Sequence, residues 1–351
     1  NNQHSYYTTA GGAWGTQTIG KGISYITLWM FYDTTAYPNA LPNITMEVNG
    51  NIVPNVSNLA LAQAFSVSPP KCIYDFMTSK TYGMGIPGFD MDTASFSAAV
   101  TYCDATITIA GASGTITTQA RYTCNGFLNS GESPMANLEK MLTSCNGRIV
   151  YENGKYSLKL RKATAPETFQ LDETNIVGDW SFKRAGIDET PNSIKVTYID
   201  TALNFQPQTI TWPYPDDANP YLVEDGGLLN EMSVELPFTT NEYMAVMLAS
   251  QILLENREDV TCTLTAQREA LKLTVGSVVE VSHSTTGWDE KEMSVEAISL
   301  RADGLVEIAL KEFNDDTYDL PVFKTAIGAV ASNLPKAYAS GTAQAPTVGP
   351  F

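Results

Sequence analysis

The stretch Ser68-Pro-Pro-Lys-Cys-Ile-Tyr-Asp-Phe-Met-Thr-Ser-Lys-Thr-Tyr-Gly-Met-Gly-Ile-Pro87 marks a change in the character of the chain. Proline is favoured in the first turn of a helix, so Pro69 and Pro70 predict a helix start. Gly83 and Gly85 interrupt the pattern and end the helix. Apolar residues at one- and four-residue spacing share one helix face. They are Cys72, Ile73, Phe76 and Met77.

Two more helices and a hairpin are expected between this stretch and residue 165. Asp92 is expected to cap the first of these two helices. Ser133-Pro134 predicts the start of the other, and Asn146-Gly147 predicts its end in a left-handed cap. Asn153-Gly154 joins two alternating strands, 148–152 and 155–160, into a hairpin. The inward positions of the helices are Phe96, Ala99, Val100, Cys103, Leu138, Met141, Leu142 and Cys145. With further strands near 105–110 and 115–124, residues 66–165 form a mixed helix and strand segment.

The rest of the chain is dominated by strand patterns. Residues 1–16 predict a loop, 17–33 a long strand, and 44–54 a hairpin around Asn49-Gly50. A helix over about 240–257 carries apolar residues at helical spacing: Met244, Met247, Leu248, Ile252 and Leu253. Strands are expected near 177–184, 193–200, 208–212, 230–236, 260–268, 277–283, 292–301 and 305–312. The pattern predicts an α+β, β-rich fold, and residues 321–351 have the composition of a linker.

Composition and charge limit the functions to consider. The chain has 351 residues, enough for two or three domains. Charged residues make up only 17% of it, which suits a β-rich protein that packs against other subunits, although a secreted β-protein has a similar composition. The net charge of −17 argues against a protein that grips DNA, because binding requires neutralised phosphates. The same charge is compatible with a conduit along which DNA slides.

The cysteines and the apolar runs indicate a protein that folds in a reducing cytosol. The number of cysteines is odd, no CxxC pair occurs, and the spacing matches no zinc or iron–sulfur pattern, which favours buried free thiols over a disulfide or metal site. The cysteines are Cys72, Cys103, Cys124, Cys145 and Cys262. No signal peptide is visible, and the apolar run Ile23–Tyr32 is too short for a membrane helix, so no stable membrane insertion is expected. Because the chain does not begin with Met, we expect processing or excision from a longer protein.

The candidate chemical motifs are weak. Gly83-Met-Gly-Ile-Pro-Gly88 fits G-x-G-x-x-G, but it follows a helix and contains Pro87, which favours a structural turn over a nucleotide site. The two histidines, His4 and His283, have no G-x-S-x-G partner, so a Ser-His-Asp hydrolase is disfavoured. The acidic pairs in Trp212–Asp217 and Asn314–Tyr318 match no calcium loop, which favours solvated turns over an ion site.

Aromatic residues do not change this conclusion. Trp14, Trp212 and Trp288 have the chemistry to bind a glycan, but burial in a core or an interface is the commoner use of tryptophan. The aromatic residues are not interleaved with a basic patch, which disfavours a stacking platform for single strands. The sequence therefore predicts no catalytic residue, no cofactor and no metal ligand, and hence no enzyme.

An ordered series of motifs resembles the family of lambda-type phage tail tip attachment proteins (the protein J family). The family pattern has a proline-led helix, Tyr-Asp-x-Leu-Thr and Tyr-Gly-x-Gly-Ile-Pro. This chain follows it at residues 69–87, with Met77 in place of the leucine. Val275-Gly276-Ser277 replaces the family's Pro-Gly-Asp. The other matching features, within about residues 18–320, are Asp92, Phe96, Tyr102-Cys-Asp104, Arg121–Gly126, Asn153–Tyr156, Pro191–Tyr198, Leu236–Phe238, Arg257 and Leu273–Val278.

The resemblance implies a trimeric central hub at the distal end of a tail tube, with β-barrel domains that mimic tube subunits. It implies a segment 1–65 that completes a barrel, a mixed domain 66–165, a barrel domain 166–320 with one long helix, and a linker 321–351. The partners would be two further copies, the distal tail ring, the tape measure protein and a C-terminal fibre that contacts the host receptor. DNA would pass through without specific binding.

The resemblance also places the protein in the virion tail tip, after synthesis in the cytoplasm of the bacterial host. It carries no catalytic residue over to this chain. Two other functions stay open at this point: a tail-associated cell-wall hydrolase and a module that binds the host receptor.

Overall fold

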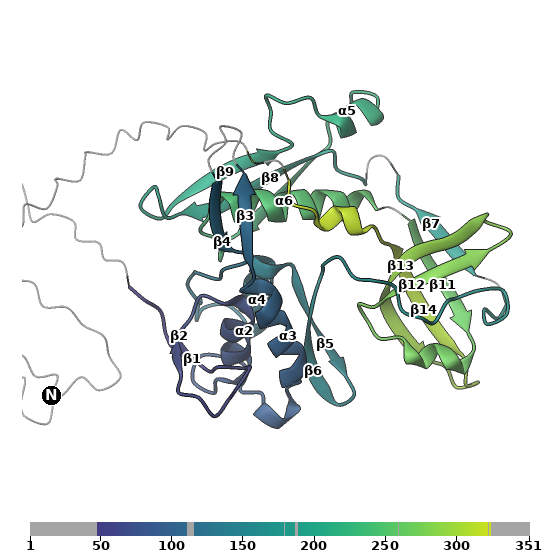
Figure 1. Cartoon of the computed structure of the whole chain (residues 1–351), viewed down its shortest axis with the longest axis horizontal. Helices are drawn as coiled ribbons and strands as arrows, with labels where there is room; N and C mark the ends of the chain where they lie inside the picture. The colour runs from purple at the N-terminus through teal and green to yellow at the C-terminus, as the bar shows by residue number, and fades with distance from the viewer. Residues whose placement is uncertain are drawn as a thin grey trace, which may run out of the picture. The chain divides into compact units, whose positions relative to one another are not determined.

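The computed structural model describes residues 48–110, 116–178, 180–186, 189–258, 260–321 and 323 (Figure 1). The chain divides into two compact units, Asn1–Asn49 and Gly50–Phe351, and the elements below belong to the second. Helices and strands are both present, with strands in the majority, so the α+β, β-rich class is confirmed. Several expectations lie outside the described residues. They are the N-terminal loop, the strand 17–33, residues 44–47 of the hairpin 44–54, His4, Trp14 and nearly all of the C-terminal linker.

Three helices form where their caps predict them. They are α2 (Pro69–Thr78), α3 (Thr93–Cys103) and α4 (Pro134–Leu142). Asp92 accepts a hydrogen bond from the Ala94 N–H, and Ser133 accepts one from the Ala136 N–H, so each side chain satisfies a backbone donor that the first turn leaves unpaired. The predicted inner face of α3 is buried at all four positions.

Short hairpins accompany these helices. β3 (Thr106–Ala110) pairs with β4 (Ile116–Ala120), and β5 (Gly147–Glu152) pairs with β6 (Lys155–Leu160). Asn153 and Gly154 have φ angles of 52° and 76°, as their hairpin turn requires. The left-handed cap after α4 falls on Asn146, with a φ of 47°, after a 3-10 turn at Thr143–Cys145. β1 (Ile52–Val53) pairs with β2 (Ala64–Phe65), which follows it in the chain. The sequence pattern did not predict this pairing.

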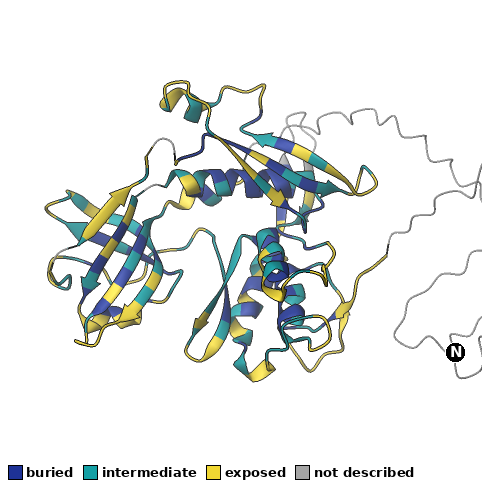
Figure 2. Ribbon diagram, turned by 180° about the vertical axis from the view of Figure 1, so that it is seen from behind, coloured by how far each residue is buried: buried dark blue, intermediate teal, exposed yellow. Residues whose placement is uncertain are grey.

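A three-stranded sheet packs on the long helix α6 (Glu242–Arg257). The strand order is β10 (Glu231–Leu236), β8 (Ser193–Asp200) and β9 (Gln206–Trp212), with β10 parallel to β8. A parallel neighbour needs a long crossover, and residues 201–230 supply it, including the unpredicted helix α5 (Pro220–Glu224). Alternate residues of β8, Ile194, Val196 and Tyr198, are buried, and Figure 2 shows α6 buried along most of its length.

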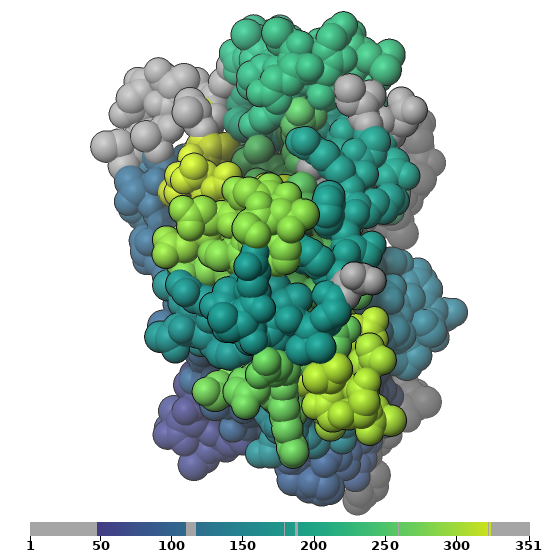
Figure 3. Space-filling view, turned by 90° about the vertical axis from the view of Figure 1, so that its right-hand side faces the viewer, coloured from purple at the N-terminus to yellow at the C-terminus, as the bar shows by residue number. Residues whose placement is uncertain are grey.

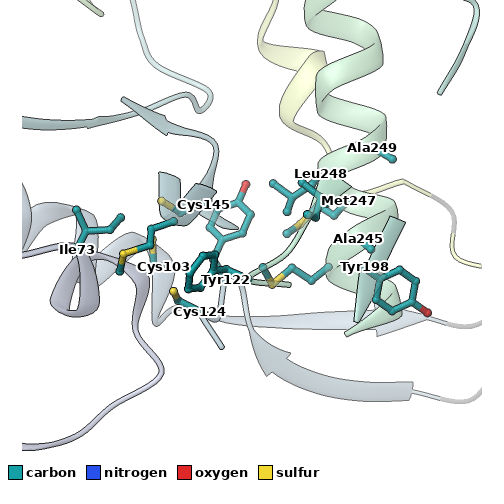
Figure 4. Close-up of a cluster of buried hydrophobic side chains, with 14 of the residues drawn as sticks. Ile73, Cys103, Tyr122, Cys124, Cys145, Tyr198, Ala245, Met247, Leu248 and Ala249 are labelled. Carbon is teal, nitrogen blue, oxygen red and sulfur yellow. The ribbon is translucent and has the colours of Figure 1, made fainter. Parts of the chain in front are cut away.

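One hydrophobic core joins α2, α3 and α4 to the three-stranded sheet and α6, so side chains from both sides of residue 165 share it (Figure 4). Residues 121–126 connect the two groups. The Tyr122 N–H donates to Cys103 O, the Cys124 N–H to Val67 O, and the Asn125 N–H to Phe238 O. The fully buried Tyr122 hydroxyl donates to Gln251 Oε1 on α6 at 2.9 Å.

Replacing Tyr122 by phenylalanine is expected to destabilise the protein by about 1–2 kcal/mol. The change leaves a buried amide oxygen of Gln251 without its donor. A buried acceptor without a hydrogen bond destabilises the folded state by its full desolvation free energy. Urea unfolding followed by circular dichroism measures the effect. Tyr151 is largely exposed, so the matched variant Tyr151→Phe is expected to change stability by less than about 0.5 kcal/mol. Equal unfolding midpoints for the two variants would contradict the role of this hydrogen bond.

A five-stranded antiparallel sheet holds a second core. Its order is β12 (Val278–His283), β13 (Trp288–Leu300), β14 (Val306–Glu312), β11 (Val260–Ala266) and β7 (Ser181–Arg184). The strands agree with the predicted positions, except that β13 begins four residues earlier and β7 four residues later than expected. The inward side chains form a cluster of their own that includes Leu171, Cys262, Val281, Val295 and Ile308.

The five-stranded sheet is not a closed barrel among the described residues, although one segment contacts both the edge strand β12 and β11, which is the neighbour of the other edge strand, β7. The Leu171 N–H donates to Glu280 O, and Leu171 O accepts from the Ser282 N–H, beside β12. A few residues later the Val177 N–H donates to Thr265 O on β11. No continuous ladder closes the gap, because this segment makes only isolated bridges before it becomes β7.

Candidate functional site

The glycine motif is a structural turn that closes α2. The N–H groups of Met84 and Ile86 donate to the carbonyl oxygens of Phe76 and Met77 at 3.0 and 2.9 Å, which satisfies acceptors that the helix end leaves unpaired. A Cβ atom on Gly83 would lie 1.7 Å from Phe76 O, so the chain passes too close for any side chain. The predicted structural role of the motif is confirmed by this geometry.

His283 lies at the end of β12, as predicted, but its surroundings do not form a catalytic triad. Its ring packs on Trp180, with 4.6 Å between ring centroids. Its Nδ1 accepts from the Thr285 N–H, while Ser284 donates both its N–H and its hydroxyl to Glu173 rather than to the imidazole. In a catalytic triad the histidine is hydrogen-bonded to both the nucleophile and the acid. Here the carboxylate of Glu173 accepts directly from Ser284.

The acidic pairs have different environments. Asp216 and Asp217 lie in an exposed turn, as expected. Asn314, Asp315 and Asp316 are exposed, as expected of a solvated turn. The turn takes the form of the 3-10 helix Asp315–Tyr318, in which Thr317 is buried. Asn314 caps this turn by accepting from the Asp316 N–H, and the Asp315 carboxylate accepts from the Thr164 N–H. Tertiary packing against residues 161–164 and α6 explains the burial.

The tryptophans within the described residues serve packing. Trp212 packs partly buried against the first core, in edge contact with Tyr214. Trp288 packs against the second core, with Trp180 perpendicular to it at 5.3 Å. Both rings are therefore engaged in contacts within the protein.

Charged side chains concentrate where the five-stranded sheet meets the first core. Glu255, near the end of α6, is only 9% exposed. Its carboxylate accepts from Arg161 Nη1 and from Asn146 Nδ2, each at 2.7 Å, and its backbone oxygen accepts from Lys311 Nζ at 2.7 Å. Glu255 therefore links the residues that flank β5 and β6 to strand β14. We call these residues and the pairs described next the ionic junction.

Two more ion pairs extend the ionic junction. Arg148 on β5 contacts Glu296 on β13 at 2.6 Å and also donates to Val295 O. Lys291 on β13 pairs with Glu312 on β14. A cavity of about 20 Å³, large enough for one water molecule, lies among these groups. Its walls include Glu255, Glu258, Lys311, Glu312 and Tyr318.

The ionisation of these groups follows from their burial. Burial raises the pKa of Glu258, and nearby Glu312 raises it further. Burial lowers the pKa of Lys311, with Arg161 acting in the same direction. Burial also raises the pKa of Tyr318, so that its hydroxyl stays protonated. Most charges in the ionic junction are compensated by a partner, which suits a structural joint between two cores better than a reactive centre.

Metal binding and membrane insertion find no support in the part of the chain that the structure describes. No group of three or more His, Cys, Asp or Glu side chains there is arranged to hold a metal ion. The helices described are also too short or too polar to cross a membrane. The ionic junction escaped the sequence analysis because its pairs, such as Arg148 with Glu296, lie up to 148 positions apart.

Exposed apolar side chains gather in two loops. Phe127 is 96% exposed, with Leu128 and Met135 nearby in sequence. The loop that carries them is held firmly, since Asn129 and Asn137 exchange two hydrogen bonds of 2.9 Å. Val223, Leu228 and Leu229 are exposed in and after α5, in the region at the top of Figure 3. Exposed apolar side chains that lie close together in the sequence are candidates for contact with other molecules.

Part of this chain is similar in sequence to known proteins. Residues 133–295 match the family model described as a putative phage tail protein. This segment of the chain is similar to phage tail proteins. The matched segment contains most of the ionic junction, including Arg148, Arg161 and Glu255. The similarity to phage tail proteins that the motif series predicted is supported over this segment, whereas membership of the lambda-type tail tip family stays a prediction.

A curated relative supports the same relationship. The baseplate hub protein pb3 of Escherichia phage T5 is 22% identical over 195 residues, or 55% of this chain. The chain spans only 20% of that relative's length.

Three solved structures are similar to this one, each over about half of the chain. The first, the virion of a native gene transfer agent particle, gives a TM-score of 0.47 at 14% identity, over 56% of this chain and 43% of the other. A 43 kDa tail protein of prophage MuSo2 from Shewanella oneidensis gives a TM-score of 0.36 at 17% identity, over 55% of this chain and 56% of the other. Prophage tail protein gp18 from Listeria monocytogenes gives a TM-score of 0.32 at 15% identity, over 56% of this chain and 55% of the other.

Proposed function

We propose that this chain is a structural part of a phage tail tip of the lambda type, forming a trimeric central hub at the distal end of the tail tube. The observation that carries the proposal is the 195-residue alignment with a baseplate hub protein. In this role the hub joins the tube to a central fibre and surrounds the path along which DNA leaves. The distal tail ring and the tape measure protein are its neighbours, and the fibre contacts the host.

The described structure supports a mechanical role. Two cores are connected by compensated ion pairs, and the candidate chemical residues serve turns, caps and packing. The exposed loops with Phe127 and Val223 offer apolar contacts for neighbouring subunits. The net charge of −17 fits a conduit that repels DNA phosphates. We propose that residues 66–165 and 166–320 act as two parts of this hub, with residues 1–65 completing the second.

Light scattering on the purified chain tests the proposed assembly. A trimer is expected at three times the chain mass of 38.1 kDa. The apolar loops supply the driving force, so Phe127→Ser combined with Leu228→Ser is expected to shift the mass toward that of a monomer. A wild-type chain that stays monomeric at high concentration and forms no ring with tail tubes would overturn the trimeric hub.

The same preparation separates the proposed role from its alternatives. A cell-wall hydrolase would clear a suspension of purified peptidoglycan, and we expect no loss of turbidity. A receptor-binding module would adhere to host cells without the fibre, and we expect no adhesion by this chain alone. Retention of DNA on the immobilised protein at physiological salt would contradict the proposed conduit.

A further inference from the structure

Four of the five cysteines come from different elements and meet in the first core. Cys72 lies on α2, Cys103 on α3, Cys124 in the connecting segment 121–126, and Cys145 in the 3-10 turn after α4. Figure 4 shows Cys103, Cys124 and Cys145 grouped around Tyr122. Cys262 belongs to the second core. The described structure therefore creates a thiol cluster that sequence spacing does not suggest.

Within this cluster, Cys72 and Cys124 are neighbours on two independent grounds. The Cys72 thiol lies 3.5 Å from Ser66 O, and the Cys124 N–H donates to Val67 O at 2.8 Å, so both residues are held against the same short segment. The two thiols are also close enough to shift each other's pKa. Cys72 is only partly buried, whereas Cys103, Cys124 and Cys145 are buried.

The two thiols differ in access to an oxidant. Cys72 is partly exposed, whereas Cys124 is buried. The contact with Cys72, together with burial, raises the pKa of the Cys124 thiol. Because the thiolate is the nucleophile and must reach the oxidant, Cys72 attacks first.

We propose that Cys72 and Cys124 form a reversible intramolecular disulfide when the folded protein meets a small disulfide such as oxidised glutathione. The Cys72 thiolate attacks one sulfur of the oxidant, whose S–S bond breaks and releases one glutathione thiolate. Cys124 then loses its proton and attacks the Cys72 sulfur, which releases the second glutathione. Two protein thiols are oxidised, and one glutathione disulfide is reduced to two thiols.

The bond would tie α2 to the segment that connects the helices to the rest of the first core. Residue Asn125, next to Cys124, is bound through its N–H to Phe238 O and through its side chain to Thr240. Because the disulfide removes conformations from the unfolded chain, the oxidised protein unfolds at a higher temperature than the reduced protein. Reducing agents reverse the shift.

Mass spectrometry after treatment with oxidised glutathione tests the proposal in three variants. The wild-type protein is expected to lose two alkylatable thiols and to yield a peptide pair joined through Cys72 and Cys124. The variant Cys124→Ser lacks the second thiol and is expected to keep one glutathionyl group on Cys72. The variant Cys72→Ser is expected to remain unmodified at Cys124. Burial raises the pKa of Cys262 to about 12, so Cys262→Ser serves as the control and is expected to form the disulfide like the wild type.

Three results would overturn the proposal. One is a wild-type protein that keeps the glutathionyl group on Cys72, since the second step then fails. Another is a crosslink between Cys103 and Cys145, which are buried in the same thiol cluster. The third is full alkylation of all thiols after oxidation. Near-ultraviolet circular dichroism before oxidation shows whether each variant has kept its native packing.

Discussion

Replacing Gly83 by alanine is expected to destabilise the protein by about 3 kcal/mol, at the upper end of the range for overpacked sites. The added Cβ would lie 1.7 Å from Phe76 O and 2.8 Å from the carbonyl carbon of the same residue. These are backbone atoms of α2, so neither can rotate aside as the end of a flexible side chain would. The turn must move outward, which breaks the hydrogen bonds from Met84 and Ile86 to the last carbonyls of the helix.

Urea unfolding of the Gly83→Ala variant measures this cost. Gly50→Ala is a matched control, because a Cβ there meets no atom within 4 Å, and its effect is expected to stay within about 0.5 kcal/mol. Both changes reduce the freedom of the unfolded chain in the same way, so their difference reports the clash alone. A Gly83→Ala protein as stable as the control would mean that the turn does not close on α2 as described.

Replacing Glu255 by alanine is expected to cost about 3 kcal/mol. The carboxylate is buried and accepts from Arg161 and Asn146, so its removal leaves a guanidinium and an amide without their acceptor. Breaking a buried ion pair on one side costs about 3–5 kcal/mol, and the lower end applies because the Arg161 side chain is 36% exposed. The loss is expected to separate the unfolding of the five-stranded sheet from that of the first core.

A double-mutant cycle with Arg161→Met isolates the contribution of the pair. If the ion pair is the source of the effect, the double variant is expected to be less destabilised than the two single changes added together. The exposed pair between Lys183 and Glu189 provides the control, and Glu189→Ala is expected to cost less than about 1 kcal/mol. Strict additivity at Glu255 and Arg161 would show that the ionic junction does not hold the two cores together.

Local patterns predicted the helices and most strands because neighbours in the chain decide them. Asp92 and Ser133 cap helices through donors only two or three residues away. The alternation in residues 193–200 predicts β8 at its observed bounds, because side chains of a strand alternate between two faces. The 3-10 helix Asp315–Tyr318 was missed because it depends on contacts with Thr164 and α6, far away in the sequence.

Such local patterns do not predict which strands pair with each other. The parallel pairing of β10 with β8 depends on the crossover through β9 and α5, and α5 itself is too short to give a helical period. The barrel expected from the family resemblance is an open five-stranded sheet in the described structure, with residues 171–177 contacting β12 and β11. Closure depends on the path of one connecting segment, which no local pattern records.

The sequence by itself determined the stretch from Ser68 to Pro87: a proline-led helix, its buried face and the glycine turn that ends it. It also predicted that Cys72 and the other cysteines lie among apolar neighbours. Only the tertiary structure decided what surrounds that helix, including the approach of Cys124 to Cys72 and the pairing of Arg161 with Glu255. The physical reason is distance along the chain. Caps, turns and amphipathic faces are set within a few residues, whereas contacts between residues 50 or more positions apart form only when the whole chain has packed.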